Sequence, residues 1–266
     1  MQLFTGLIFG VSIAGIAYRL KALNPSGTIA AAFVGWIIWG LGGVSWAIIL
    51  LIFFVSSSTL SRMFKERKSN LHEKFSKGSR RDWAQVLANG GAGSAAAILA
   101  YTYPQNVWIW AAYLGAMATV TADTWATELG VLNKHAPRLI TTGEKVVTGT
   151  SGAVSLLGTL ATLGGAAVIS VFGAIFLFQD KAIILMLSVT LGGMCGAFFD
   201  SLLGATIQAI FTCPACQKET ERYPTHACGT ATIPQRGWSW LNNDWVNFIA
   251  SIVGAVIAMG ILVLLT

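Results

Sequence analysis

The sequence predicts an all-α polytopic membrane protein with about eight transmembrane helices and a polar site at their cytoplasmic ends. Over half of its 266 residues are hydrophobic and only 11% are charged, whereas soluble domains carry about 25% charged residues. Three stretches, 107–121, 152–178 and 182–199, contain no charged residue at all. One membrane span needs about 20 mostly apolar residues, and a soluble core would not leave stretches like these without a polar face.

Hydropathy and the Lys/Arg clusters divide the chain into eight predicted spans within a single domain, residues 1–266. The run 28–60 is too long for one helix, and Gly40, Gly42 and Gly43 predict a break within it; without this break the count would be seven. We interpret the first span as a helix rather than a signal peptide, because no basic segment precedes it and no small-residue cleavage site follows. The predicted spans are 2–18, 28–41, 43–62, 82–101, 107–131, 150–178, 181–211 and 243–265.

The Lys and Arg residues predict which helix ends face the cytoplasm, because these residues collect on the cytoplasmic side. The basic loop 62–81 holds eight of the 17 Lys and Arg residues, so we place it inside. Alternation of the spans then puts loops 19–27, 132–149 and 212–242 inside as well, and only Lys181 falls outside. Both termini are therefore expected on the non-cytoplasmic side.

Acidic and polar residues gather near the predicted cytoplasmic ends of four spans. Asp123, Glu128 and Asp200 lie within spans, where an ionised group costs about 2.5–3.5 kcal/mol at the centre of a helix. Such groups are retained for pairing, for substrate or for metal. Polar neighbours recur on one helix face. The four stripes are Asp82, Gln85 and Asn89; Thr119, Asp123 and Thr127; Asp200, Gly204 and Gln208; and Asn243 with Asn247, next to Asp244.

Each of these acids also has a plainer interpretation. Asp82 and Asp244 begin helices, where a carboxylate caps the first turn and interacts favourably with the helix dipole. Asp123, Glu128 and Asp200 could be buried ion-pair partners, although the Lys or Arg would have to come from the loops, since their own spans contain none. Both alternatives remain open from the sequence.

Carboxylates beside basic loops favour a Mg²⁺–phosphate site with Asp123, Glu128 and Asp200 as ligands. Mg²⁺ takes oxygen ligands, commonly one or two carboxylates plus substrate phosphates, and Lys or Arg neutralises charge on a transferring phosphoryl group. In the segment 138–152, Lys145 precedes Thr150 and Ser151, which we expect to hold phosphate at a helix N-terminus. The segment is not a Walker A loop, and an ordinary turn is the alternative.

The basic segment before the fourth predicted span has two expected roles. Arg80 and Arg81 adjoin Asp82, and we expect these two side chains to contact substrate. The other basic residues of 65–77 are interpreted as solvated charge that sets the topology of the chain.

Three of the four cysteines lie in one polar loop. Cys213 and Cys216 form a CxxC pair, and His226 and Cys228 follow in the same loop. This spacing fits a tetrahedral, structural Zn²⁺ site with Cys₃His ligation, and a reducing cytoplasmic side disfavours a disulfide. A redox CxxC and unrelated thiols are the alternatives. Cys195 lies in an apolar, Gly-rich span, where we expect it to serve packing.

Five segments together resemble one family of integral membrane proteins, the family that includes the plant plastid phytyl-phosphate kinase of tocopherol synthesis. This family is similar in turn to polyprenol kinases and CTP-dependent lipid cytidylyltransferases, which share an acidic D-x-x-A-x-x-x-G segment matched here by Asp123, Ala126 and Gly130. Its prokaryotic members favour a prokaryotic cell membrane as the location. The segments are KGSRRDWAQVLANGG (77–91), ADTWATELG (122–130), PRLITTGEKVVTGTSGAVSLLGT (137–159), FDSLLGA (199–205) and LNNDWVN (241–247).

The resemblance implies phosphoryl transfer from a nucleoside triphosphate, CTP or ATP, to an isoprenyl monophosphate, giving the prenyl diphosphate. Asp123 and Glu128 would hold Mg²⁺, with Asp200 as a further ligand or as an orienting group. The attacking phosphate oxygen is already anionic, so catalysis would consist mostly of positioning and charge neutralisation. Phosphate or substrate contacts are expected from Arg80, Arg81, Asp82, Asn89, Arg138, Lys145, Thr150, Ser151, Gln208, Asn243 and Asn247.

Three other functions compete with this one. Cytidylyl transfer to a lipid phosphate would use the same acids and metal. A lipid-phosphate transporter or flippase would need polar groups through the full membrane depth and preferably inverted repeats, whereas the outer halves of the spans are nearly free of charge. A purely structural role does not account for the clustered acids, and we expect no nucleic-acid partner.

Overall fold

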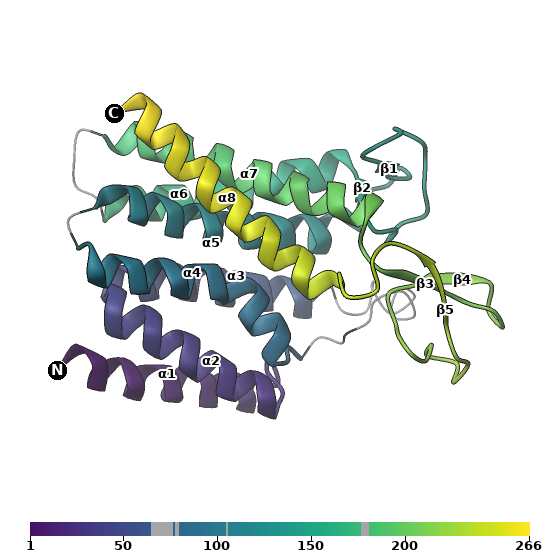
Figure 1. Cartoon of the computed structure of the whole chain (residues 1–266), viewed down its shortest axis with the longest axis horizontal. Coiled ribbons are helices and arrows are strands. Elements are labelled where there is room, and N and C mark those ends of the chain that lie inside the picture. Colours follow the sequence, from purple (N-terminus) through teal and green to yellow (C-terminus); the bar gives the residue numbers. More distant parts are fainter. Residues whose placement is uncertain (65–76, 78–79, 105, 177–180) are drawn as a thin grey trace.

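The computed structural model describes residues 1–64, 77, 80–104, 106–176 and 181–266 as a bundle of α-helices that run side by side (Figure 1). Each of the eight predicted spans corresponds to one α-helix in the described part of the chain. The helices are α1 (Gln2–Arg19), α2 (Pro25–Ile37), α3 (Val44–Met63), α4 (Trp83–Thr102), α5 (Val107–Gly130), α6 (Leu156–Ile175), α7 (Ala182–Thr206) and α8 (Asn243–Leu265).

Six helical segments are long and apolar enough to cross a membrane, with α2 counted together with the short π-helical turn η1 (Ile38–Gly42). The other two long helices, α4 and α5, carry more polar residues. They are also shielded by neighbouring helices, since α5 contacts α3, α4, α6, α7 and α8. A helix that lies inside a bundle needs less hydropathy than one that faces lipid. The count of eight crossings therefore stays a prediction.

The break between the second and third spans lies where glycine predicted it. η1 ends at Gly42, and Gly43 has a φ of 91°, a conformation that glycine adopts without the steric cost of a Cβ atom. The helix α3 then begins at Val44. At its other end, α2 begins at Pro25, three residues before the predicted start, because Asn24 accepts a hydrogen bond from Gly27 N at 2.8 Å and caps the helix.

Two predicted helix ends are wrong because apolar composition continued past the helix. The span 150–178 begins as a helix only at Leu156, after the N-cap Ser155. The residues before it form a turn and the strand β2 (Ala153–Val154), which pairs antiparallel with β1 (Arg138–Leu139). The span 181–211 ends as a helix at Thr206, and the next apolar residues belong to the strand β3 (Ile210–Cys213). Hydropathy does not distinguish a buried strand from a continuing helix.

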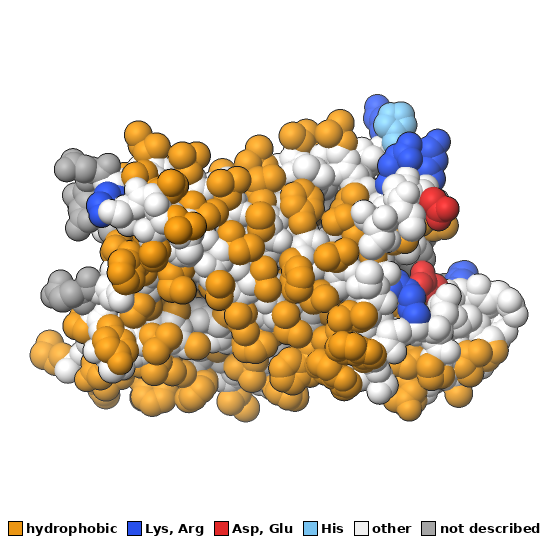
Figure 2. All heavy atoms as spheres, turned by 45° about the horizontal axis from the view of Figure 1, so that its top comes forward, with side chains coloured by type: hydrophobic (Ala, Val, Ile, Leu, Met, Phe, Trp, Pro, Cys, Tyr) orange, Lys and Arg blue, Asp and Glu red, His pale blue; other side chains and the backbone are white. Residues whose placement is uncertain are grey.

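The loop 212–242 contains a small antiparallel sheet that the all-α prediction missed. Its strands are β3, β4 (Lys218–Thr220) and β5 (Ile233–Arg236), in the order β4-β3-β5. This sheet lies beyond the helix ends, opposite the two chain termini, which share the other end of the bundle (Figure 1). Apolar side chains cover the helical body in Figure 2, and most of the visible charged side chains gather at the end that carries the loops.

Both termini lie at the same end of the bundle, which agrees with an even number of membrane crossings. Which end faces the cytoplasm stays a prediction, and four residues of the basic loop, Lys65, Arg67, Lys68 and Lys74, lie outside the described residues.

The core is centred on α5, where close helix contacts depend on small residues. Gly115 of α5, Gly192 of α7 and Gly254 of α8 meet, and a Cβ atom at Gly254 would lie 3.0 Å from the Gly192 carbonyl oxygen and 3.1 Å from that of Gly115. Small residues of this kind let membrane helices approach closely. In contrast, Cys195 of α7 is exposed, so the expectation that it serves packing is wrong: it lies on the outward face of the helix.

This packing predicts that Gly254→Ala destabilises the bundle. A methyl group at this position would overlap Thr119 Oγ1 and the two facing backbones, and overpacking of a core costs about 1–3 kcal/mol. The midpoint of thermal unfolding in detergent should therefore fall. The matched control is Gly260→Ala on the same helix, where no heavy atom lies within 4 Å of the new Cβ. Equal midpoints for both variants would contradict this description of the core.

Candidate functional site

A polar cavity of about 340 Å³ lies at the loop-bearing end of the bundle. Its walls include residues of α4, α5, α6, α7 and α8, of the segment 148–155, and Glu221, just after β4 (Lys218–Thr220). Polar groups from separate helices therefore meet at one face of the membrane, as the stripes in the sequence predicted. The predicted site residues that line it are Arg81, Asn89, Asp123, Glu128, Thr150, Ser151, Asp200, Asn243 and Asn247.

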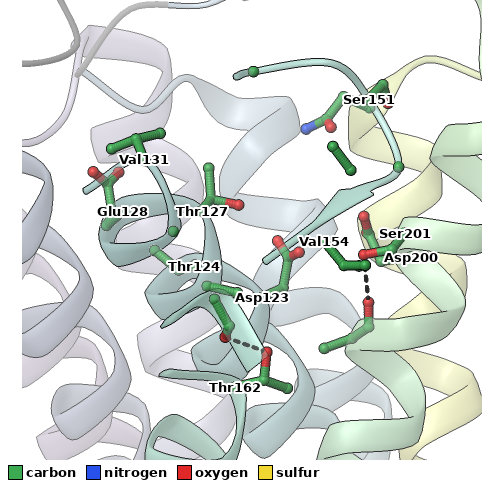
Figure 3. A pocket seen from close by; sticks show the side chains of 18 of the residues that line it. Asp123, Thr124, Thr127, Glu128, Val131, Ser151, Val154, Thr162, Asp200 and Ser201 are labelled. Carbon is green, nitrogen blue, oxygen red and sulfur yellow. Dashed lines mark hydrogen bonds between the residues drawn. The ribbon is translucent and has the colours of Figure 1, made fainter. Parts of the chain in front are cut away.

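Three carboxylates form an acidic cluster, which comprises Asp123 on α5, Asp200 on α7 and Glu221 just after β4. The negative charges of Asp123 and Glu221 act on Asp200, and Figure 3 shows Asp123 beside Asp200 and Ser201. The oxygen Oδ2 of Asp200 is buried and has no hydrogen-bond partner among the described residues. A buried carboxylate oxygen in such a cluster is expected to bind a cation or a hydrogen-bond donor.

Glu128 lines the cavity from another side. It lies five positions after Asp123, which turns its side chain about 140° around α5, and Figure 3 shows the two carboxylates well apart. Glu128 is only 7% exposed, and its Oε1 accepts a hydrogen bond from Ser61 of α3 at 2.7 Å. Its charge also attracts Arg81. Glu128 therefore connects α3, α5 and the segment before α4, while its predicted role as a metal ligand stays a prediction.

Arg81 is held at the cavity by its backbone and by two aromatic rings. Its N–H donates to Ala22 O at 3.0 Å, and its carbonyl accepts from Asn24 N at 3.1 Å. The guanidinium carbon lies 5.1 Å from the ring centre of Phe53 and 5.7 Å from that of Phe54. Burial lowers the pKa of Arg81 to about 10, although the charge of Glu128 opposes this shift. The side chain therefore remains a cation at neutral pH.

Lys77 is a second cation at the cavity. It forms ion pairs with Asp82, at 2.9 Å, and with Asp244. The interpretation of residues 65–77 as solvated charge is therefore wrong for Lys77. Asp82 does not line the cavity: it is the N-cap of α4, where it accepts from Gln85 N at 2.9 Å and forms a capping box with Gln85, as the plainer interpretation of this residue allowed.

The segment 148–155 curves over the cavity between β1 and α6. Gly149 and Gly152 have φ values of 83° and 80°, and Gly152 lies directly against Ala205 at the end of α7. Ser151 Oγ donates to Gln208 Oε1 at 2.9 Å, and Gln208 Nε2 donates to Glu221 Oε1 at 2.9 Å. Gln208 therefore lies behind the cavity wall and joins the segment to the acidic cluster.

Besides Asp82 and Gln208, three predicted phosphate contacts lie outside the cavity. Arg80, Arg138 and Lys145 are exposed, and the guanidinium of Arg138 donates to Gly143 O at 2.6 Å. The sequence analysis in turn missed Lys77 and Glu221. Glu221 was visible in the sequence as an acidic residue of the cysteine-containing loop. Nothing in the order of the elements along the chain indicated that this loop folds back onto α7, so the signal was weak.

The predicted zinc ligands lie together at the small sheet. Cys213 ends β3, Cys216 lies in the β3–β4 turn, and His226 and Cys228 follow in the loop before β5. Their four ligand atoms lie within 4.8 Å of one another. This cluster is separate from the cavity, which none of the four residues lines.

Comparison with known proteins identifies the family. The model of the family described as integral membrane protein DUF92 matches residues 8–255. Protein PGR of Arabidopsis thaliana is 33% identical, with 92% of each chain covered. An uncharacterized membrane protein of Methanocaldococcus jannaschii is 34% identical, with 97% of this chain and 94% of that protein covered.

A third relative is the Arabidopsis thaliana protein VTE6, chloroplastic, at 26% identity over 94% of this chain and 68% of that protein. No solved structure matches the chain. The family model spans nearly the whole chain, and the membrane family that the five motifs predicted is confirmed. The chain is a member of the integral membrane protein family DUF92.

Proposed function

We propose that this protein transfers a phosphoryl group from a nucleoside triphosphate to an isoprenyl monophosphate at the membrane surface. The observation that carries the proposal is the pair of adjoining pockets. An apolar pocket of about 70 Å³ between α1, α2, α3 and α4 adjoins the polar cavity with its acids and cations. Arg81, Gln85 and Asn89 line both. A charged headgroup with an apolar chain has the chemistry that suits this pair.

The acidic cluster has the donor set that Mg²⁺ prefers. Asp123, Asp200 and Glu221 offer carboxylate oxygens alone, and the partnerless Oδ2 of Asp200 supplies a buried acceptor. Mg²⁺ in proteins is usually held by one or two carboxylates together with substrate phosphates. In our proposal Asp123 and Asp200 hold the ion, and Glu128 keeps Arg81 in place from the opposite wall. When bound, Mg²⁺ would neutralise charge on the nucleotide phosphates.

The chain's own groups would position the two phosphates. Arg81 and Lys77 place positive charge at the cavity, and the residues of the segment 148–155 line it from the side of α6. The terminal anhydride P–O bond of the nucleotide breaks, and a new anhydride bond forms to an oxygen of the lipid phosphate. The nucleoside diphosphate leaves. Because the attacking oxygen is already anionic, no protein base is needed.

The apolar pocket would hold the first part of the prenyl chain. Its other lining residues include Ala14, Ala31, Val34 and Leu51. A volume of about 70 Å³ holds only a short piece of hydrocarbon, so the rest of the chain would extend between the helices into the lipid. The family resemblance supports this substrate class, since the family that the motifs resemble includes the plant plastid phytyl-phosphate kinase.

Replacing the two proposed metal ligands, Asp123 and Asp200, provides the main test. Purified protein in detergent receives geranylgeranyl monophosphate, Mg²⁺ and labelled CTP or ATP, and mass spectrometry measures the prenyl diphosphate. Asp123→Asn and Asp200→Asn should each lower turnover by at least about 100-fold, the scale of a lost charge-stabilising group. Glu219→Gln, outside the cavity, is the control and should retain turnover. A CDP-lipid product would favour cytidylyl transfer, and unchanged turnover in Asp123→Asn would remove this residue from the mechanism.

The two neighbouring arginines should behave differently. Arg81→Gln removes a cation that lines the cavity, whereas Arg80→Gln changes an exposed residue. We expect the loss in kcat/KM to be at least about 10-fold greater for Arg81→Gln, since truncating a charge at a desolvated site costs more than truncating one in solvent. Steady-state kinetics of both variants with the same lipid measures the difference. Equal losses would show that cavity position does not decide the role of these residues.

A bulkier residue in the apolar pocket should shorten the accepted chain. Ala31→Phe fills part of the pocket, so turnover of geranylgeranyl monophosphate should fall while turnover of dimethylallyl monophosphate persists. The second substrate also shows that the variant is folded. Ile29→Phe is the matched control, because Ile29 lies on the same helix and is 74% exposed. A parallel loss with both substrates, or none with either, would contradict a chain-binding role for this pocket.

A further inference from the structure

The second polar cluster, at the small sheet, has the geometry of a metal site. Cys213 Sγ lies 3.5 Å from Cys228 Sγ, and His226 Nδ1 lies 3.1 Å from Cys228 Sγ and 3.7 Å from Cys216 Sγ. A tetrahedral ion with Zn–S bonds of about 2.3 Å and a Zn–N bond of about 2.0 Å places its ligand atoms about 3.5–3.8 Å apart. All four ligand atoms lie within 4.8 Å of one another, so small side-chain shifts would bring one nitrogen and three sulfurs to the spacing of a zinc site.

The surroundings of the cluster also favour a metal over free thiols. His226 is only 3% exposed, and its Nδ1 faces Cys216 and Cys228. The buried apolar side chains of this sheet come from β3, whereas Ile233, Pro234 and Gln235 of β5 are exposed. A small sheet with one buried apolar strand has limited apolar contact of its own. A bound ion that joins β3, the β3–β4 turn and the following loop would add stability.

We propose that Cys213, Cys216, His226 and Cys228 bind one structural Zn²⁺ ion, which holds the small sheet against the end of α7. All four positions are protein ligands, so the site is closed and offers no open position for catalysis. A disulfide between Cys213 and Cys228 is the alternative. Their sulfur atoms lie 3.5 Å apart and would have to approach to about 2.05 Å to form the bond. That alternative would leave His226 and Cys216 without a shared role.

The zinc site also has a consequence for the polar cavity, and this part rests on the proposed function. Glu221 follows β4 directly, and it accepts the hydrogen bond from Gln208, which in turn accepts one from Ser151. The strand pairing of β3 with β4, from Phe211↔Thr220 to Cys213↔Lys218, connects the metal ligands to Glu221. Zinc would therefore act as a positioning element that keeps Glu221 in the acidic cluster and the segment 148–155 over the cavity.

Metal analysis of the purified full-length protein tests the site directly. We expect about one Zn²⁺ per chain when the protein is expressed with zinc and purified without chelator. Cys216→Ser and His226→Ala should each lose the metal, while Cys195→Ser should retain it, because Cys195 lies on the outer face of α7. Replacement of zinc by Co²⁺ should give the visible absorption bands of a tetrahedral, thiolate-bound ion.

Thiol labelling provides a second measurement that does not depend on folding of the variants. In the wild-type protein a zinc chelator should add three alkylated cysteines to the number labelled without it. A fully reduced protein that contains no zinc, or an intact mass that shows a Cys213–Cys228 disulfide, would overturn the proposal.

Glu221→Gln separates the two proposals, because it leaves the metal ligands intact. Its zinc content should equal that of the wild type, while its kinase turnover should fall if the acidic cluster binds substrate metal. Zinc binding without any kinase activity would reject the proposed function and retain the zinc site.

Discussion

The structure depends on keeping carboxyl groups at the ends of apolar helices. An uncompensated carboxylate within a membrane is costly, and Asp123 and Asp200 lie on the two helices, α5 and α7, that pack against each other and against α8. Compensation must therefore come from the cavity that these residues line. Arg81 and Lys77 supply positive charge at other parts of the cavity, beside Glu128 and beside Asp82 and Asp244. At the acidic cluster itself, a divalent ion and its bound substrate would supply the compensation, which gives a physical reason for acids and cations to share one end of the bundle.

Arg81 shows how the loops are tied to this requirement. Its backbone is fixed by Ala22 and Asn24, which connect α1 to α2, and its guanidinium packs over Phe53 and Phe54 of α3. Glu128 then faces the guanidinium from α5. The N-terminal helices are therefore more than an anchor: they hold a cation at the boundary between the polar cavity and the apolar pocket. This boundary is where the phosphate of a membrane lipid would lie.

Composition and periodicity predicted the helical bundle well, because the cost of exposing polar backbone and side chains to lipid leaves few alternatives. The eight helices, the break at Gly43 and the convergence of Asp123 and Asp200 followed from the positions of apolar runs, glycines and polar stripes. Lys77 and Glu221 could not be predicted in the same way. They reach the cavity from loop segments, and their positions depend on tertiary contacts. Lys77 pairs with Asp82 and with Asp244, which is 167 positions away, and Glu221 accepts a hydrogen bond from Gln208.

The cavity has two kinds of wall, and the difference between them bears on turnover. The helical wall is held by close contacts such as those among Gly115, Gly192 and Gly254, so Asp123 and Asp200 keep a fixed separation, as metal binding requires. The opposite wall consists of the segment 148–155 and Glu221, which hydrogen bonds through Gln208 join to each other. Such bonds break at lower cost than helix packing. In the proposed reaction, a water-soluble nucleotide would therefore exchange at the loop wall, while the lipid would enter between the helices.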